Sequence, residues 1–263
     1  MATVSLVECE SYEQERLSRS IEAGFRNLSF DNARFRNALV TLKPNLLTGV
    51  HPDTAVITHP AFFRAVAAFA KDCGARLRLV ESPAIQPLSR VMKKTGYEDI
   101  VREMGVEVVH QPDIAVIHGS EGATFRRFEV ARQALDADIV LNLPKLKTHG
   151  ITYLTGAVKN LFGLIPGTRK AQWHMRAKTK EEFSSFLIDY YQALLASFGD
   201  GEKLITVMDA VVGMEGKGPG TSGKPRQVGA IIAGADALAI DFVAASLVGL
   251  EVGEIFTITE GAG

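Results

Sequence analysis

The stretch DIVLNLPKLKTHGITYLTGAVKNLFGLIPGTRKAQWHMRAKTK, residues 138–180, is the segment around which the rest of the chain is organised. It begins with a short apolar run, Ile139 to Leu141, which is typical of a strand buried on both faces of a sheet. Asn142 and Pro144 end this run, because proline cannot donate a hydrogen bond to a strand ladder. The segment therefore predicts a buried strand followed directly by polar and basic residues.

Positive charge is concentrated in the same stretch. The whole chain has a formal net charge of -1, yet residues 139–180 contain no Asp or Glu. The basic residues there are Lys145, Lys147, Lys159, Arg169, Lys170, Arg176, Lys178 and Lys180, with His149 and His174 beside them. A local cationic field in a nearly neutral protein indicates an anionic ligand. Lys178 and Lys180 fit ordinary surface charge equally well.

Spacing within the stretch indicates which basic residues act together. Lys145, Lys147 and His149 alternate, so an extended segment would point all three to one side. Lys159 follows in a segment that mixes helix formers with glycines, which allow close approach of a ligand or of another backbone. If a helix begins near Thr152 or Thr155, its positive end adds to the lysines. We therefore expect an anion to bind at that helix start.

Strand-like and helix-like segments alternate along the remaining chain. This alternation predicts an α/β fold, a doubly wound, mainly parallel sheet with helices on both faces. Without a linker or an internal repeat, residues 1–263 are expected to form a single domain. Ligands bind such sheets at the carboxyl ends of the strands. The residues expected to gather at that edge are Asn45, Ser82, Asn142 and Asp209.

Composition excludes several classes of protein. The chain has 263 residues, 46% hydrophobic and 22% charged, as in a globular protein. Its two cysteines, Cys9 and Cys73, form no CxxC, which argues against an iron–sulfur cluster within the chain and favours the reducing cytoplasm. Balanced charge argues against nucleic-acid binding. The apolar window Ile231 to Leu250 contains two aspartates and fits a strand, a turn and a helix, so no membrane span is expected.

Two further features suggest chemistry. Gly218 to Lys224 matches the GxxxxGK skeleton of a phosphate loop, but Pro225 replaces the magnesium-binding hydroxyl and a strand follows. Residues 213–223 are then either a lid or backbone cradle, or simply a hairpin connection.

Asp241 stands among apolar residues of a predicted helix over 237–249, where a carboxylate must be paired. We expect it to be buried and hydrogen-bonded.

Several motifs together resemble the domain of unknown function 362 family over essentially the whole chain. They are Lys43-Pro44-Asn45, Thr58-His59-Pro60, residues 142–149, residues 156–163, Ile165-Pro166-Gly167 and residues 209–219. Some members of that family carry ferredoxin-like cysteine clusters, which this chain lacks. A shorter pattern, His149, Gly156, Lys159 and Pro166-Gly167, is similar to the nickel-pincer lactate racemases. That similarity implies a lysine, here Lys159, that holds the cofactor covalently.

These observations lead to two hypotheses. The first is an enzyme acting on a small anionic substrate, a carboxylate or a phosphate. His149, Lys159 and His174 would be catalytic, and the substrate would be bound by Lys43, Asn45, Asn142, Lys145, Lys147, Gly163 and Gly216. Asp209, Glu215 and Asp241 would hold a divalent metal or orient a histidine. The second is a non-catalytic redox partner or ligand-binding subunit that works with a separate iron–sulfur protein. A homodimer is compatible with either. Finding Lys159 and His149 in one pocket with Asp209 or Glu215 would favour the enzyme.

Overall fold

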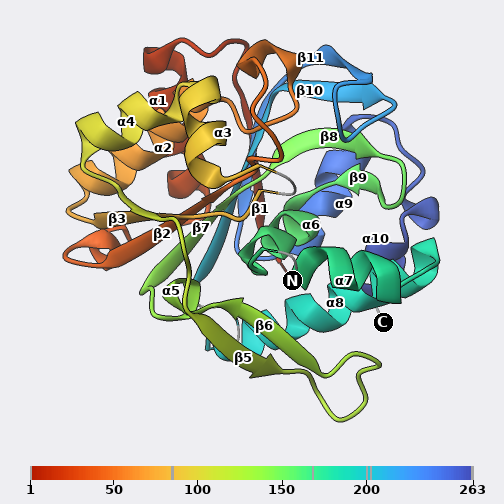
Figure 1. Cartoon of the computed structure of the whole chain (residues 1–263). Coiled ribbons are helices and arrows are strands. Elements are labelled where there is room, and N and C mark those ends of the chain that lie inside the picture. Colours follow the sequence, from red (N-terminus) through yellow and green to blue (C-terminus); the bar gives the residue numbers. More distant parts are fainter. Residues whose placement is uncertain (1, 84–85, 168, 200, 202, 262–263) are drawn as a thin grey trace.

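The computed structural model describes residues 2–83, 86–167, 169–199, 201 and 203–261. Among these residues, nine strands form a central, mainly parallel sheet (Figure 1). Seven of them lie side by side in the order β1 (Val4–Glu8), β11 (Gly223–Gly234), β10 (Leu204–Gly216), β7 (Ile139–Leu143), β2 (Leu39–Pro44), β3 (Arg76–Val80) and β4 (Glu107–Val109). Strands β10 to β4 run parallel, whereas β11 pairs antiparallel with both of its neighbours.

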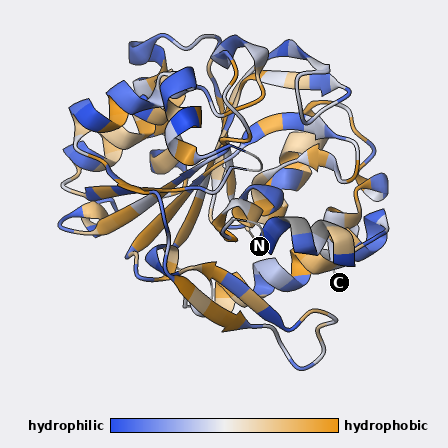
Figure 2. Ribbon diagram, in the orientation of Figure 1, coloured by the Kyte–Doolittle hydropathy of each residue, from blue (hydrophilic) through white to orange (hydrophobic). Residues whose placement is uncertain are grey.

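Both faces of this sheet are covered, which confirms the doubly wound α/β prediction. In β7, Ile139 and Leu141 belong to one hydrophobic core, whereas Val140 belongs to the other. The first face is covered by α1 (Gln14–Asn27), α2 (Pro60–Asp72), α3 (Leu88–Thr95) and α4 (Tyr97–Met104). The second face is covered by α6 (Ala157–Leu161), α8 (Lys180–Ser197), α9 (Ala237–Leu247) and α10 (Phe256–Gly261). Figure 2 shows the strands as predominantly hydrophobic, with hydrophilic residues on the outer sides of the helices.

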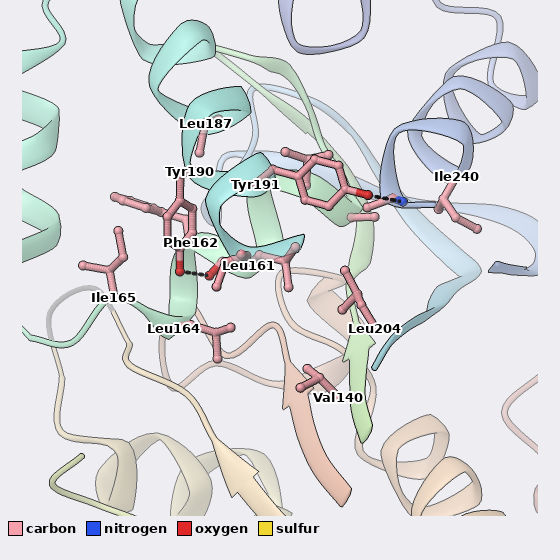
Figure 3. Packing of buried hydrophobic residues seen from close by; sticks show 14 of the residues in the cluster. Val140, Leu161, Phe162, Leu164, Ile165, Leu187, Tyr190, Tyr191, Leu204 and Ile240 are labelled. Carbon is pink, nitrogen blue, oxygen red and sulfur yellow. Dashed lines mark hydrogen bonds between the residues drawn. The ribbon is translucent and has the colours of Figure 1, made fainter. Parts of the chain in front are cut away.

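Helix α8 ties the second face together. Thr179 caps it with a capping box, in which its hydroxyl accepts from the Glu182 amide and the Glu182 carboxylate accepts from the Thr179 amide. From its buried face, the Tyr190 hydroxyl donates to the carbonyl of Leu161 in α6 (3.2 Å). The Tyr191 hydroxyl accepts from the first amide of α9, that of Ala237 (3.0 Å; Figure 3). Helix α8 is thereby fixed against two others, α9 and α6, the helix that carries Lys159.

Two short strands extend the sheet beyond the end of β7. Strand β8 (Lys145–His149) runs parallel to the second half of β10, and β9 (Tyr153–Thr155) returns antiparallel to β8. The predicted extended segment over Lys145, Lys147 and His149 is confirmed. The remaining elements are a hairpin of β5 (Ile114–His118) and β6 (Arg127–Ala131), which packs against α8, together with α5 (Arg132–Leu135), α7 (Arg169–Arg176) and four short 3-10 turns.

The glycine-rich residues 213–223 belong mainly to a hairpin. The sequence placed Asp209 at the carboxyl end of a strand, but β10 continues to Gly216, because Ala210 and Val211 carry on the buried apolar pattern through a bulge. Of the two interpretations left open, the hairpin connection is therefore the observed one. The window Ile231 to Leu250 forms the end of β11, a turn and α9. No described helix combines the length and apolarity that crossing a membrane requires.

Candidate functional site

A cavity of about 280 Å³ opens where β2, β3 and β7 end. Its lining combines loops that follow these strands with β8, β9 and α6. The lining residues are Asn45, Leu46, Leu47, Glu81, Ser82, Lys147, His149, Thr155, Lys159, Asn160, Phe162, Gly163, Lys170 and Pro219. Lys147, Lys159 and His149, which the sequence predicted to act together, lie around this one space.

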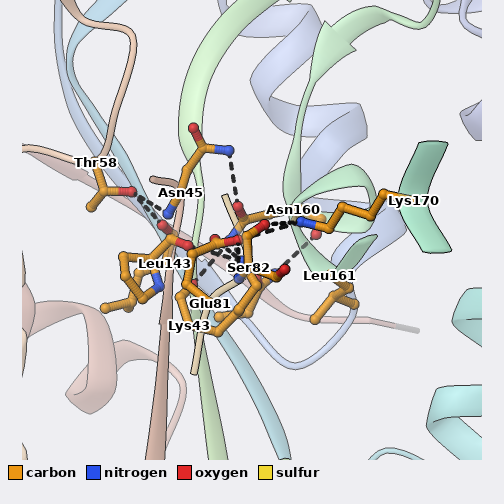
Figure 4. Close-up of polar contacts among 12 residues, drawn as sticks. Lys43, Asn45, Thr58, Glu81, Ser82, Leu143, Asn160, Leu161 and Lys170 are labelled. Atoms are coloured by element: carbon orange, nitrogen blue, oxygen red, sulfur yellow. Dashed lines mark hydrogen bonds and ion pairs between the residues drawn. The ribbon is translucent and has the colours of Figure 1, made fainter. Parts of the chain in front are cut away.

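Three asparagines fix the wall of the cavity. The Asn160 amide nitrogen donates to the Lys43 carbonyl (3.0 Å) and to Asn142 Oδ1 (2.8 Å). The Asn45 amide nitrogen donates in turn to Asn160 Oδ1 (3.1 Å; Figure 4). Asn142 is fully buried and also donates to the Ala157 carbonyl and to the Thr206 hydroxyl. These amides join β2, β7 and α6, so Asn142 supports the cavity from beneath without lining it.

Lys43 is held in a buried ion pair under the cavity. Its ammonium group lies 2.6 Å from Glu81 Oε2 and donates to the Pro44 carbonyl. Gly163 allows this pair to sit where it does, because a Cβ there would lie 2.4 Å from Lys43 Nζ and 2.7 Å from Glu81 Oε1. Lys170 of α7 approaches the same carboxylate (3.6 Å) and donates to the Ser82 carbonyl (Figure 4). Lys43 therefore supports the site through its ion pair and does not line the cavity.

A second buried ion pair, Lys145 with Asp209 (2.9 Å), lies outside the cavity lining. The Lys145 ammonium also donates to the Tyr12 hydroxyl (2.7 Å), which itself donates to Asp209 Oδ1 (2.9 Å). Asp209 Oδ2 accepts from the backbone amide of His59, whose ring stacks on Tyr12. Burial lowers the pKa of His59 to about 4, so this imidazole is neutral. Lys145 thus serves to neutralise Asp209.

Lys147 and Lys159 differ from Lys43 and Lys145, because neither amine has a carboxylate partner among the described residues. Lys147 is 1% exposed and donates only to neutral oxygens, Asn45 Oδ1 (2.9 Å) and the Val56 carbonyl (2.6 Å). Lys159 Nζ lies over the rings of Phe162 (5.1 Å) and Phe183 (5.0 Å). Burial lowers the pKa of Lys147 to about 7, helped by the charge of Lys159. Burial, with the charge of Lys170 beside it, lowers the pKa of Lys159 to about 7.

His149 stands at the end of β8, on the same side of the strand as Lys147. Its Nδ1 accepts hydrogen bonds from the backbone amides of Ile151 (3.0 Å) and Thr152 (3.2 Å). Because Nδ1 accepts, these bonds assign the proton of the neutral ring to Nε2. The other predicted catalytic histidine, His174, belongs to α7, but its side chain lies outside the described residues.

The start of α6 is occupied by a carboxylate of the chain itself, which corrects our expectation of an external anion there. Asp241 of α9 is 3% exposed, and its two oxygens accept from the amides of Ala157 (2.5 Å) and Val158 (3.1 Å). Burial raises the pKa of Asp241 to about 7, against the lowering effect of the two amide donors. The prediction that Asp241 is buried and hydrogen-bonded is confirmed. The positive charge that remains for a ligand comes from lysine side chains.

The three predicted metal ligands are not brought together. Asp209 is paired with Lys145, and Asp241 caps α6. Glu215 is exposed, pairs with Arg226 (3.3 Å) and borders another groove, beside the β10–β11 hairpin, which shares Lys147 with the cavity. Within the described ranges, no group of three or more His, Cys, Asp or Glu side chains could hold a metal ion. The expected pocket therefore contains Lys159 and His149, but neither Asp209 nor Glu215.

Gly216 also lies outside the cavity lining. It ends β10 with a positive φ of 85°, and its carbonyl accepts from the Thr148 hydroxyl (3.0 Å). The hairpin contributes Pro219 to the cavity wall instead. No site role was predicted for Glu81, Thr155, Asn160 or Lys170. Glu81 and Lys170 were visible as charges and Asn160 lies in the motif over residues 156–163, but nothing in the sequence indicated a ligand contact at Thr155.

Comparisons with known proteins agree with this architecture. The model of the family described as domain of unknown function (DUF362) matches residues 40–246. A thylakoid-associated protein of Synechocystis sp. is 34% identical over 262 residues, covering 97% of this chain and 77% of the relative. Among solved structures, the lactate racemase apoprotein from Thermoanaerobacterium thermosaccharolyticum has a TM-score of 0.58 at 16% identity. That match covers 95% of this chain, which spans 57% of the racemase, and it shows a shared fold.

The resemblance to nickel-pincer lactate racemases implies a cofactor bound covalently to Lys159, so the surroundings of Lys159 bear on it. Lys159 and His149 border the same cavity. The pKa of Lys159, lowered to about 7 by burial, favours the neutral amine that a covalent bond requires. Within that resemblance, Lys159 is the residue that would hold such a group.

Proposed function

This chain belongs to the domain of unknown function 362 family, and we propose that it is an enzyme acting on a small anionic substrate, a carboxylate or a phosphate. The substrate binds in the cavity at the carboxyl ends of β2, β3 and β7. One observation carries the proposal: Lys147 and Lys159 line a single small cavity, and no described carboxylate pairs with either amine. The other two lysines predicted to bind substrate, Lys43 and Lys145, are neutralised by Glu81 and Asp209.

Electrostatics explains why an anion belongs there. Two ammonium groups taken out of water lose hydration and repel each other, so both tend to give up a proton. An anion between them restores the charged form and accepts charge-assisted hydrogen bonds from each amine. Such fixed cations also stabilise negative charge that develops during a reaction. Lys147 and Lys159 are therefore assigned to substrate binding and charge stabilisation.

His149 is assigned to proton transfer. Two backbone amides donate to its Nδ1, so the neutral ring carries its proton on Nε2. Histidine titrates near neutrality, which suits it to general acid–base catalysis. The cavity volume of about 280 Å³ admits a metabolite of a few heavy atoms and lies just below the range of drug-sized pockets. Lactate, after which the structurally similar racemase is named, is a carboxylate of that size class.

The alternative, a ligand-binding subunit or redox partner without catalysis, is favoured by the position of the acidic residues. Asp209 and Glu215, which we expected beside the histidine of an enzyme, lie outside the cavity lining. Among the described residues, the carboxylate that lines it is Glu81, which is already paired with Lys43. A binding protein would hold the anion without converting it. For location we propose the cytoplasm, since Cys9 and Cys73 are both free thiols.

The test begins with native mass spectrometry of freshly purified protein, with metal analysis, to detect a co-purifying anion or an adduct on Lys159. A panel of small carboxylates and phosphates is then titrated calorimetrically, and binders are followed by NMR for conversion. We expect at least one binder to be converted, and conversion to be lost in Lys159→Met. Binding without conversion across the panel would favour the ligand-binding subunit. No binding by any member would contradict both assignments.

A further inference from the structure

Thr155 carries a buried hydroxyl without a hydrogen-bond partner. The residue is 4% exposed, and its Oγ1 is fully covered yet bonded to none of the described residues. Buried hydroxyls nearly always find a partner, because an unpaired one has lost its hydrogen bonds to water without replacement. An orphaned group of this kind needs a physical reason.

The position of Thr155 supplies that reason. It ends β9 and stands directly opposite Lys147 in the antiparallel pairing with β8. Opposite residues of an antiparallel pair place their side chains on the same face of the sheet. Thr155 accordingly lines the same cavity as Lys147, and Lys159 follows it four residues later on α6. Thr155 and the two lysines without carboxylate partners therefore line one space.

The other orphaned groups behave differently. Among the described buried side-chain atoms, Ser184 Oγ and Gln133 Oε1 also lack partners. Neither residue lines the cavity, and Gln133 already uses its amide nitrogen to donate to Asp113. Thr155 is thus the described residue in which an unpartnered buried polar atom and the cavity coincide.

We propose that Thr155 is a specificity-determining residue whose hydroxyl donates to an oxygen of the bound anion, beside the amines of Lys147 and Lys159. This inference rests on the proposed function and adds a neutral, directional donor to two charged ones. A carboxylate or phosphate offers several lone pairs on adjacent oxygens, so it can accept from all three groups at once. The partner that Oγ1 lacks within the chain is then supplied by the ligand.

Two substitutions at this position separate the contribution of the hydroxyl from that of the side-chain shape. Thr155→Val keeps the shape and removes the hydroxyl, whereas Thr155→Ser keeps the hydroxyl. Binding of sulfate and of acetate is measured by calorimetry, and thermal unfolding is followed without added anion. We expect Thr155→Val to bind about tenfold more weakly while its Tm equals or exceeds that of the wild type, because removing an unpaired buried donor relieves its desolvation. Thr155→Ser should bind within about threefold of wild type.

Ser184→Ala is the matched control, since it removes an orphaned hydroxyl that does not line the cavity and should leave anion affinity unchanged. The proposal is overturned if Thr155→Val binds as tightly as wild type. It is also overturned if Thr155→Val lowers the Tm of the anion-free protein, because the hydroxyl would then have a partner within the protein. A wild type that binds neither anion would overturn the proposed function as well, so the two failures are distinguishable.

Discussion

Replacing Gly156 by alanine tests how the lysine-bearing helix is held in place. A Cβ at Gly156 would lie 2.0 Å from Asp241 Oδ1 and 2.4 Å from its Cγ. Ordinary contacts between these atoms exceed 3 Å, so either α6 or the carboxylate must move by about 1 Å or more. Movement of the carboxylate breaks its hydrogen bonds to the amides of Ala157 and Val158. Gly156→Ala therefore acts on the anchor of α6, three residues before Lys159.

The magnitude follows from those two bonds. A buried amide left without its acceptor costs about 1–3 kcal/mol, so losing both costs about 2–6 kcal/mol of unfolding free energy. Asp241→Ala removes the same acceptor and should cost a similar amount. In the double variant the added Cβ meets no carboxylate, so the cost should not exceed that of Asp241→Ala alone. A double-mutant cycle then gives a coupling energy nearly equal to one single-variant cost.

The assay is urea unfolding at pH 7 of the wild type, both single variants and the double variant. Asp236→Asn is the matched control, because Asp236 caps the same helix that carries Asp241 and asparagine caps as well as aspartate does. Its unfolding free energy should stay within about 0.5 kcal/mol of wild type. Additive costs in the double variant, or a neutral Gly156→Ala, would refute the anchoring of α6 by Asp241.

Two further predictions concern charge. Sulfate keeps its charge across the range tested, so it should bind with constant affinity below about pH 6, where Lys147 and Lys159 are protonated. Above their pKa of about 7, the affinity should fall by up to about tenfold per pH unit for each lysine. A flat calorimetric profile to pH 9 would contradict this. Glu81→Gln should lower the unfolding free energy measured in urea by about 3–5 kcal/mol, since it leaves Lys43 buried beside a neutral amide. The control Glu215→Gln, on the surface, should change it by less than about 1 kcal/mol. Equal effects would count against the buried pair.

The fold was predictable because its signals are local. The apolar run at Ile139 to Leu141 and the alternation of strands with amphipathic helices specify a covered parallel sheet. The error at β10 has a clear origin. Asp209 indicated a strand end, but Lys145 neutralises its charge inside the sheet and the strand continues. A pairing between residues 64 positions apart leaves no trace in a local pattern.

The same limit applies to the site. The cluster of lysines is visible in the sequence, but which of them are neutralised depends on carboxylates elsewhere. Glu81 stands 38 residues from Lys43 along the chain, and only the fold brings them to 2.6 Å. Thr155 is an ordinary strand residue by sequence, and its significance rests on a hydroxyl that the tertiary structure leaves unpaired. Asp241 was identified as a carboxylate needing a partner, whereas its partner, the start of α6, was not.

The most direct measurement of the central claim is the affinity for sulfate, by calorimetry at pH 6, of the wild type, Lys159→Met and Lys178→Met. Lys159 borders the cavity without a carboxylate partner among the described residues, whereas Lys178 is exposed and serves as the surface-charge control. We expect Lys159→Met to weaken binding by about tenfold or more, because a charge-assisted hydrogen bond is lost, and Lys178→Met to change it by less than about twofold. Equal effects of the two substitutions would reduce the basic stretch to ordinary surface charge and contradict the account.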